Sequence, residues 1–253
     1  MNVSMSKTVK RIKEESSSVE DRIKAIVSDE NQYVLGFADL RGLLDKKFNG
    51  HDYAIVIGRR LDEEIMDSLV DGPTREYFDH YHETNRELSA LAVKVLKELK
   101  ANDVSCILIP PTVNDEELDE DYYKTLTCDF SHKMAATRAG LGWIGKTDLF
   151  VSEKFGPRVR LVTILVNHPL DSSKAPVTLS RCGKCNLCVR ECPAQAATGK
   201  LWEVNVKREE FFDAFKCREK CRELSHKLLN ENISLCGLCM AVCPIGRGLF
   251  TAD

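Results

Sequence analysis

The chain has 253 residues, 43% of them hydrophobic, which is enough for one large domain or a main domain with a smaller one attached. Its formal net charge of −3 disfavours a nucleic-acid-binding surface, which usually presents a concentrated basic face. Residues 1–30 contain no apolar targeting segment, and no apolar run approaches the ~18 residues of a membrane span. We therefore expect a cytoplasmic protein with no membrane partner.

The first part of the chain alternates helical and extended patterns. In chain order these patterns predict a helix over 19–27, strands over 33–38 and 53–58, a long helix over 74–100, a strand over 104–109, an acidic loop or short helix over 115–123, a short helix over 131–139 and a buried strand over 160–166. In the long helix an apolar stripe recurs every three to four residues, comprising Tyr77, Tyr81, Leu88, Leu91, Val95 and Leu99. This order predicts a mixed α/β layered structure.

Most of the cysteines lie in the second part of the chain. Nine of the eleven fall between Cys182 and Cys243, a concentration that in a cytoplasmic chain indicates metal ligands rather than disulfides. Residues 182–193 read C-x2-C-x2-C-x3-C-P, the spacing of bacterial-type [4Fe–4S] ligation, and residues 236–244 read C-x2-C-x3-C-P. Structural zinc is the alternative, but zinc usually takes paired C-x2-C sets. The motifs therefore predict two [4Fe–4S] clusters.

Two clusters with four cysteine ligands each require one thiolate more than the two motifs supply. The missing ligand is expected in FKCREKC, as Cys217 or Cys221. In proteins with two such clusters, the last cysteine of a motif serves the neighbouring cluster. One ligand set is then Cys182, Cys185, Cys188 and Cys243. The other is Cys192, Cys236, Cys239 and either Cys217 or Cys221.

The two parts meet at residues 167–176, which are rich in proline, serine and aspartate. The second part has few extended runs, short helices and a core too small to stand alone, so cluster binding is expected to support its folding. We predict an α/β domain over residues 1–175 and a ferredoxin-like domain with two [4Fe–4S] clusters over residues 176–253.

Residues 140–147, GLGWIGKT, fit two phosphate-binding patterns, G-x-G-x-x-G and G-x4-G-K-T. Both patterns require a strand before the glycines and a helix after them, whereas here a helical segment precedes Gly140 and an extended one follows Lys146. This context disfavours nucleotide binding. Two interpretations remain: a glycine turn between a helix and a strand, or close contact between glycines around an exposed Trp143 and a large flat ligand.

Together these motifs resemble the epoxyqueuosine reductases. The resemblance rests on AGLGWIGK at 139–146, the two cysteine motifs and GFADL at 36–40, and it runs from about residue 20 to 250. Corrinoid-dependent reductive dehalogenases are similar in this core. The resemblance implies a cobalamin between the two domains beside the two clusters, and it favours Cys217 over Cys221. It also implies cofactor contacts from a set of loop residues, Gly140, Gly142, Trp143, Gly145 and Lys146.

The catalytic aspartate of that family lies in a VD-x-x-P stretch shortly before the glycine loop. The corresponding residues here, TLTCDFSHK, contain no proline, and Asp129 lies near the expected position but is displaced from it. His132 is an alternative proton donor, because an imidazole titrates near neutrality. In a purely structural interpretation, Asp129 and Ser131 simply cap a helix.

The leading hypothesis is a cytoplasmic redox protein that passes electrons from a low-potential donor, of ferredoxin or flavodoxin type, through two clusters to a corrinoid that reduces a small substrate. One alternative is a ferredoxin-type electron carrier or corrinoid-handling partner with no substrate chemistry of its own. The other is an epoxyqueuosine reductase acting on tRNA, which the lack of a basic face disfavours.

Overall fold

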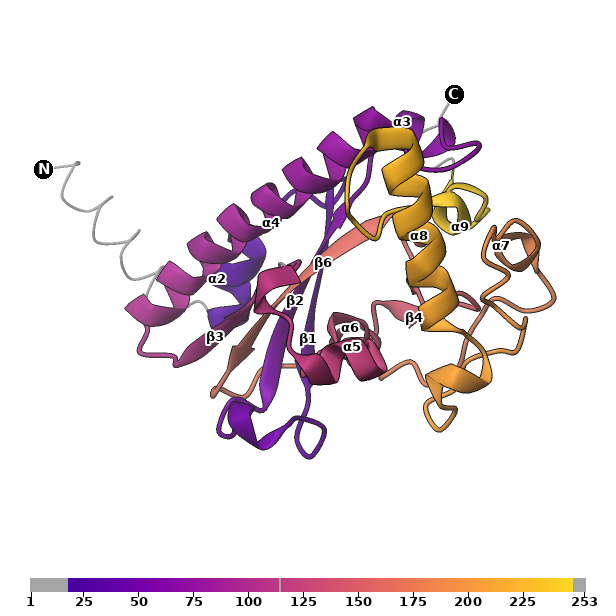
Figure 1. Cartoon of the computed structure of the whole chain (residues 1–253). Coiled ribbons are helices and arrows are strands. Elements are labelled where there is room, and N and C mark those ends of the chain that lie inside the picture. Colours follow the sequence, from indigo (N-terminus) through magenta and orange to yellow (C-terminus); the bar gives the residue numbers. More distant parts are fainter. Residues whose placement is uncertain (1–17, 114, 248–253) are drawn as a thin grey trace, which may run out of the picture.

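A four-stranded antiparallel sheet forms the centre of the α/β part in the computed structural model, which describes residues 18–113 and 115–247 (Figure 1). The strands lie in the order β1-β2-β6-β3. Their bounds are Tyr33–Asp39 for β1, Tyr53–Arg60 for β2, Cys106–Ile109 for β3 and Val159–Val166 for β6. The two central strands, β2 and β6, are buried along most of their length because both faces of the sheet are covered.

Helices α2 (Val19–Ile26) and α4 (Arg75–Ala101) cover one face of the sheet. Helix α6 (His132–Arg138) packs on the other face with residues from β1 and β2. The apolar cores on the two faces of the sheet therefore both contain residues of the central strands β2 and β6. The mixed α/β class predicted from the sequence is confirmed.

The long predicted helix is confirmed as α4, and its start is fixed by Thr74, whose side chain accepts a hydrogen bond from the Tyr77 amide at 3.2 Å. Five of the six predicted stripe positions are buried. The sixth, Tyr81, lines a cavity instead. Its place on the stripe therefore brings a phenol to the edge of the core.

Short elements lie in the connections between the strands and long helices of the α/β part. They are η1 (Lys46–Phe48), α3 (Glu63–Asp67), η2 (Asp115–Glu117), α5 (Glu120–Thr125) and a hairpin of β4 (Gly142–Ile144) and β5 (Phe150–Ser152). After Lys146 the chain continues into β5, as expected from the context that disfavours a phosphate-binding loop. The glycine segment itself contains strand β4, so the interpretation of residues 140–147 as a glycine turn between a helix and a strand is incomplete.

The cysteine-rich part contains α7 (Leu187–Arg190), η3 (Arg208–Glu210), α8 (Ala214–Leu229) and α9 (Leu238–Ala241). Helix α8 has 16 residues, so the expectation of short helices alone is wrong. Residues of α9 pack with Met66 of α3 and Tyr77 of α4 in one apolar cluster. The division at residues 175 and 176 stays a prediction.

Within the described part of the chain, no helix combines the length and the apolar character needed to cross a membrane. Residues 1–17, which carry part of the expectation about targeting, lie outside the described residues.

Candidate iron–sulfur and redox site

The first cysteine motif forms a loop that is held by the β4–β5 hairpin. Lys146 is buried, and its Nζ donates hydrogen bonds to the carbonyl oxygens of Gly183 at 3.0 Å and Cys185 at 2.9 Å, and to Oδ1 of Asn186 at 2.7 Å. The indole Nε1 of Trp143 donates to the Cys182 sulfur at 3.3 Å. The hairpin therefore fixes the loop that presents these thiols.

Four cysteines from the two motifs gather at one place. Burial raises the pKa of Cys188 to about 11, and the neighbouring thiols Cys182, Cys243 and Cys185 add to the rise because nearby negative charges disfavour a further thiolate. Helices α7 and α9, which precede Cys192 and Cys243, pack against each other. This arrangement supports the first predicted ligand set, with Cys243 crossing over from the second motif.

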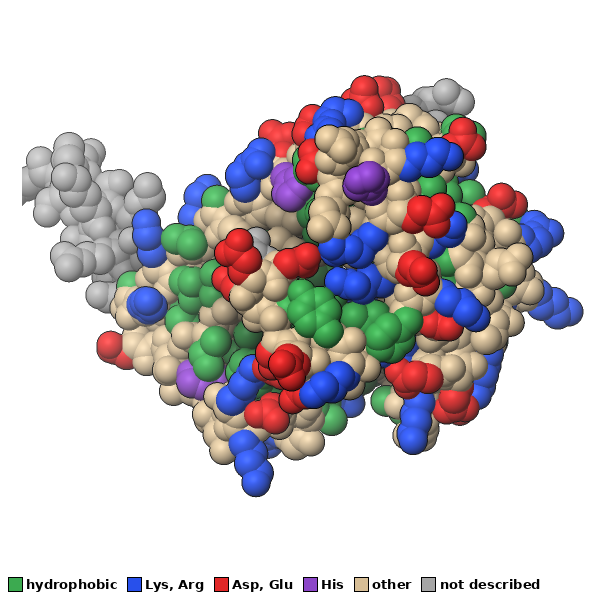
Figure 2. All heavy atoms as spheres, in the orientation of Figure 1, with side chains coloured by type: hydrophobic (Ala, Val, Ile, Leu, Met, Phe, Trp, Pro, Cys, Tyr) green, Lys and Arg blue, Asp and Glu red, His purple; other side chains and the backbone are tan. Residues whose placement is uncertain are grey.

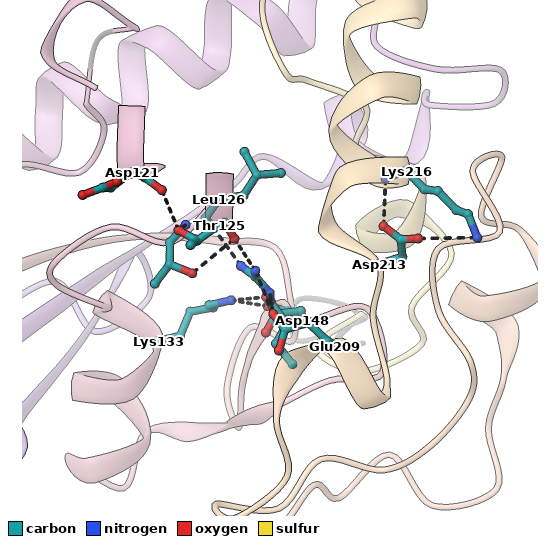
Figure 3. Close-up of polar contacts among 10 residues, drawn as sticks. Asp121, Thr125, Leu126, Lys133, Asp148, Glu209, Asp213 and Lys216 are labelled. Atoms are coloured by element: carbon teal, nitrogen blue, oxygen red, sulfur yellow. Dashed lines mark hydrogen bonds and ion pairs between the residues drawn. The ribbon is translucent and has the colours of Figure 1, made fainter. Parts of the chain in front are cut away.

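The second group of cysteines centres on α8. Asp213 caps this helix by accepting a hydrogen bond from the Lys216 amide at 3.0 Å, which places Cys217 in the first turn (Figure 3). The sulfurs of Cys217 and Cys221 lie 3.8 Å apart. Cys221 also hydrogen-bonds Cys236 and lowers its pKa to about 7. Both candidates for the missing ligand thus lie beside the second motif, and the choice between them stays open.

Two adjoining cavities lie between the sheet and the cysteine-rich part. The inner cavity, of about 440 Å³, is walled by cysteines of the second group, among them Cys192, Cys217 and Cys239. The outer cavity, of about 850 Å³, extends past α5. The two share Tyr81 and His132 on their walls, so they adjoin each other, and the inner one reaches the second group of cysteines.

A tyrosine–arginine pair stands at the junction of the cavities. The guanidinium of Arg160 lies over the Tyr81 ring at 4.4 Å from its centroid and donates to the Tyr81 hydroxyl at 3.4 Å. Burial raises the pKa of Tyr81, but the charge of Arg160 and hydrogen bonds to Thr112 and Asn85 outweigh it, so the net pKa lies below the usual tyrosine value. Arg160 thus stabilises the ionised form of the Tyr81 side chain.

His132 does not behave as the sequence predicted. Its Nδ1 lies 2.7 Å from the Thr163 hydroxyl and its Nε2 lies 3.0 Å from the carbonyl oxygen of Pro110. Burial lowers the pKa of His132 to about 4, so the expectation that it titrates near neutrality is wrong. The ring is neutral at physiological pH and is held on both nitrogens.

Asp129 lies on the wall of the outer cavity, where its carboxylate forms an ion pair with Lys47. Its side chain is 67% exposed. Ser131, and not Asp129, caps α6 by accepting a hydrogen bond from the Met134 amide at 3.2 Å. A catalytic role for Asp129 therefore stays a prediction, with the residue at the open end of the site.

The glycine-loop residues lie on the cluster side of the hairpin. Trp143, expected to be exposed, is 5% exposed and packs with Val151 and Val177, so that expectation is wrong. A Cβ at Gly142 would lie 2.0 Å from the Val151 carbonyl oxygen, which explains why this hairpin position has no side chain. Gly140, in the left-handed region at φ +67°, ends α6, and Gly145 lies near the Cys182 sulfur. Direct cofactor contact by Gly140, Gly142, Trp143, Gly145 and Lys146 stays a prediction.

Helix α5 closes the cleft by contacts with the cysteine-rich part (Figure 3). Arg208 of η3 donates to the carbonyl oxygens of Leu126 at 2.8 Å and Thr125 at 2.5 Å, at the C-terminal end of α5. Deeper in the cleft, Lys133 of α6 donates to Oδ2 of Asp148 at 2.6 Å and joins the sheet layer to the β4–β5 hairpin. These contacts give the cavities defined walls on both sides.

Sequence reasoning did not identify Tyr81 and Arg160 as site residues. Tyr81 was assigned to an apolar stripe, and Arg160 stood at the start of an apolar strand. A charged residue in such a strand, RLVTILV, is the one signal that pointed to a buried partner.

Comparisons with known proteins agree with this architecture. Residues 181–246 match the family described as the 4Fe-4S double cluster binding domain. An epoxyqueuosine reductase from Listeria monocytogenes is 33% identical over 130 residues, a match that covers 48% of this chain and 31% of that protein. The aligned region thus spans under a third of the length of this curated relative.

Two kinds of solved structure share the fold. A reductive dehalogenase, described as suggesting a mechanism for B12-dependent dehalogenation, has a TM-score of 0.64 at 19% identity and covers 89% of this chain and 31% of that chain. An epoxyqueuosine reductase with an epoxyqueuosine-modified tRNA-Tyr stem loop has a TM-score of 0.55 at 17% identity and covers 95% and 66%. The chain is therefore a homologue of the epoxyqueuosine reductases, with a double [4Fe–4S] cluster binding domain at residues 181–246 and a fold shared with reductive dehalogenases.

Proposed function

We propose that this chain is an iron–sulfur reductase of the epoxyqueuosine reductase type, in which electrons pass from the first cluster to the second and then into the inner cavity. One observation carries the proposal: the second group of cysteines and the Tyr81–Arg160 pair line the same cavity. A source of electrons and a source of protons therefore face one space. An electron carrier without substrate chemistry would not need the second of these.

The cleft fits a bulky cofactor. The inner and outer cavities adjoin each other, and together they extend from the second group of cysteines to α5. A corrinoid in this space would be held between Tyr81 and Pro111 on the sheet side and Leu235 on the cysteine-rich side. When bound there, it would supply electron-transfer chemistry at its metal beside the second cluster. The support for cobalamin is this space together with the B12-dependent mechanism described for the dehalogenase.

The protein's own contribution to the chemistry is proton delivery and orientation. Reductive removal of an epoxide oxygen consumes an electron pair and protons and releases water. Tyr81 can donate a proton because Arg160 stabilises the phenolate that remains. Neutral His132, anchored to Thr163, supports the cavity wall and does not itself supply a proton at neutral pH.

A modified tRNA nucleoside is the substrate that the comparisons favour. The expectation against tRNA rested on net charge averaged over the whole chain, and the comparisons do not support it. Basic side chains gather locally on α8, where Arg218 lines the outer cavity and Lys220 lines the inner one. Figure 2 shows Lys and Arg side chains in the hollow between α5 and α8. Such a group can contact phosphates while one base enters the cleft.

A small-molecule substrate is the second candidate. The dehalogenase fold matches 89% of this chain, and the floor of the outer cavity is apolar, with Phe48, Phe78 and Phe130 on its wall. A small halogenated aromatic compound would suit such a floor. In that case the basic residues on α8 would have no part in substrate binding.

The test is anaerobic turnover of an epoxyqueuosine-containing tRNA stem loop by cobalamin-loaded protein with a low-potential reductant. We expect conversion to the queuosine form, and a loss of about 10²-fold or more in rate for Tyr81→Phe, since a positioned proton donor typically contributes that much. The matched control is Tyr33→Phe, because Tyr33 also stacks with an arginine, Arg59, at 5.6 Å but lies outside both cavities.

Three results would contradict parts of the proposal. Full turnover by Tyr81→Phe would remove Tyr81 as the proton donor. No conversion of the stem loop by protein with both clusters intact would remove the tRNA substrate, and dehalogenation of an aromatic compound by the same preparation would then favour the second candidate. No turnover of either substrate would reduce the chain to an electron carrier.

A further inference from the structure

Arg158 lies between the sheet and the cysteine-rich part with its side chain almost wholly buried. It is 1% exposed, and its Nη2 donates to Oδ1 of Asp67 at 2.5 Å and to the carbonyl oxygen of Ala241 at 2.9 Å. Asp67 ends α3 and Ala241 ends α9. The contacts of one nitrogen therefore fix this guanidinium beside the helix that leads into Cys243.

The other two nitrogens of Arg158 have no hydrogen-bond partner. Both Nε and Nη1 are buried, and neither has a partner among residues 18–113 and 115–247. Buried N–H groups of a charged side chain are costly to leave unpaired, because they lose their hydrogen bonds to water without gaining others. A bound group with acceptor atoms is thus expected at this position.

The surroundings identify the acceptor. The Nη2 of Arg158 donates to the carbonyl oxygen of Ala241, which lies only two residues before Cys243 in the chain. The turn before Arg158 also packs closely against the backbone just after Cys243, since a Cβ at Gly156 would lie 1.9 Å from the Ile245 carbonyl oxygen. The guanidinium of Arg158 is therefore anchored to the short segment that carries Cys243, a predicted ligand of the first cluster.

We propose that Arg158 donates its free Nε and Nη1 hydrogens to sulfur atoms of the [4Fe–4S] cluster held by Cys182, Cys185, Cys188 and Cys243, and so raises the reduction potential of that cluster. A cluster with four thiolate ligands gains negative charge on reduction, so a buried cation and N–H···S hydrogen bonds stabilise the reduced form more than the oxidised form. The inference rests on that ligand set and not on the identity of the substrate.

Asp67 opposes this effect. Its carboxylate binds Arg158 and also Arg247, at 3.1 Å, so two guanidinium groups share one negative charge. The Asp67 side chain is 52% exposed, whereas that of Arg158 is 2% exposed, so water screens the carboxylate more than the arginine. The net field at the cluster is positive, and removing either group shifts it in opposite directions.

The experiment is an EPR-monitored redox titration of the anaerobically purified protein, with iron content measured for each variant. Arg158→Gln should shift one of the two clusters to a more negative potential, by at least a tenfold change in the ratio of reduced to oxidised cluster, which is about 59 mV for a one-electron couple. Asp67→Asn should shift the same cluster to a more positive potential. Arg247→Gln, which loses a more exposed guanidinium from the same two partners, should shift it less than Arg158→Gln.

The opposite signs separate electrostatic tuning from a purely structural role, in which both substitutions would disturb the cluster alike. Unchanged potentials in Arg158→Gln with full iron content would overturn the proposal, as would shifts of both variants in one direction. If Arg158→Gln loses a cluster, Asp67→Asn decides: a positive shift supports the proposal, and no shift or a negative one overturns it.

Discussion

Two cysteines on α8, Cys217 and Cys221, are the candidates for the fourth ligand of the second cluster. Cys217 lies in the first turn of the helix, beside the capping residue Asp213, and Cys221 lies one turn further on, where it is buried. Cys221 contacts the sulfurs of both Cys217 and Cys236, so its single S–H can donate a hydrogen bond to one of these two predicted ligands without Cys221 binding iron itself.

We expect Cys217→Ser to lower the iron content from about eight toward about four per chain, since a [4Fe–4S] cluster is held by four thiolates. Cys221→Ser should retain about eight. Iron and acid-labile sulfide analysis of the two variants, purified side by side without oxygen, makes the comparison. The reverse order of iron loss would assign the ligand to Cys221.

Some residues of the candidate site could be predicted from the sequence, and others could not. Spacing alone predicted the cysteine sets, because cluster ligation requires several thiols on a tight loop. Spacing could not reveal that burial would lower the pKa of His132, or that Arg160 would lie over Tyr81, because both depend on which side chains the sheet brings together. Long-range neighbours, not local pattern, set those properties.

At the level of elements, the β4–β5 hairpin links the sheet to the first cluster. Lys146 forms three hydrogen bonds with the loop of the first cysteine motif, and Trp143 contacts Cys182. A loop of this kind has few apolar residues of its own, so these bonds are expected to preserve its shape when the cluster assembles. The glycine-rich segment thus supports the loop of the first cysteine motif, whether or not it also contacts a cofactor.

Lys146→Met should therefore cause loss of the first cluster, with iron falling to about half of the wild-type content, because three acceptors on the loop lose their shared donor. Lys133→Met is the matched control, since Lys133 binds Asp148 on the same hairpin and, among the described residues, its Nζ makes no hydrogen bond to the loop of the first cysteine motif. Full iron content in Lys146→Met, together with weaker cobalamin binding, would contradict this role and favour the cofactor contact.

The elements of the α/β part could be predicted because their apolar periodicity is strong, as in α4 and β6. Helix α8 could not, for a physical reason. Its buried positions are Cys221, Ser225 and Leu229, a helical stripe in which a thiol and a hydroxyl occupy places where periodicity arguments look for large apolar residues. The hydroxyl of Ser225 can be buried because it donates a hydrogen bond to the Leu235 carbonyl oxygen at 2.8 Å.

At the scale of the whole molecule, the two parts of the chain share one apolar cluster and one cleft. Leu235 and Leu238 pack with Tyr77, four residues before Tyr81 on the same face of α4. The packing that joins the parts therefore also places the cavity residues relative to the second group of cysteines. Electrons would travel from the exposed Cys185 side of the first cluster, through the second cluster, to the Tyr81–Arg160 pair.

The proposed electron path has Arg158 at one end and the Tyr81–Arg160 pair at the other. We propose that Arg158 lies at the first cluster, where the exposed Cys185 could face an external donor and a raised potential would favour acceptance of an electron. Tyr81 and Arg160 lie at the other end, where the electron leaves. Two arginines close together in the sequence thus act at opposite ends of the proposed route.

All of this chemistry requires that the chain hold two [4Fe–4S] clusters on such a route. The most direct measurement is iron and acid-labile sulfide analysis of the anaerobic protein, combined with EPR of its dithionite-reduced form. We expect about eight irons and eight sulfides per chain and a spectrum broadened by magnetic interaction between two neighbouring reduced clusters. About four irons with the signal of an isolated cluster, or stoichiometric zinc in place of iron, would contradict the claim.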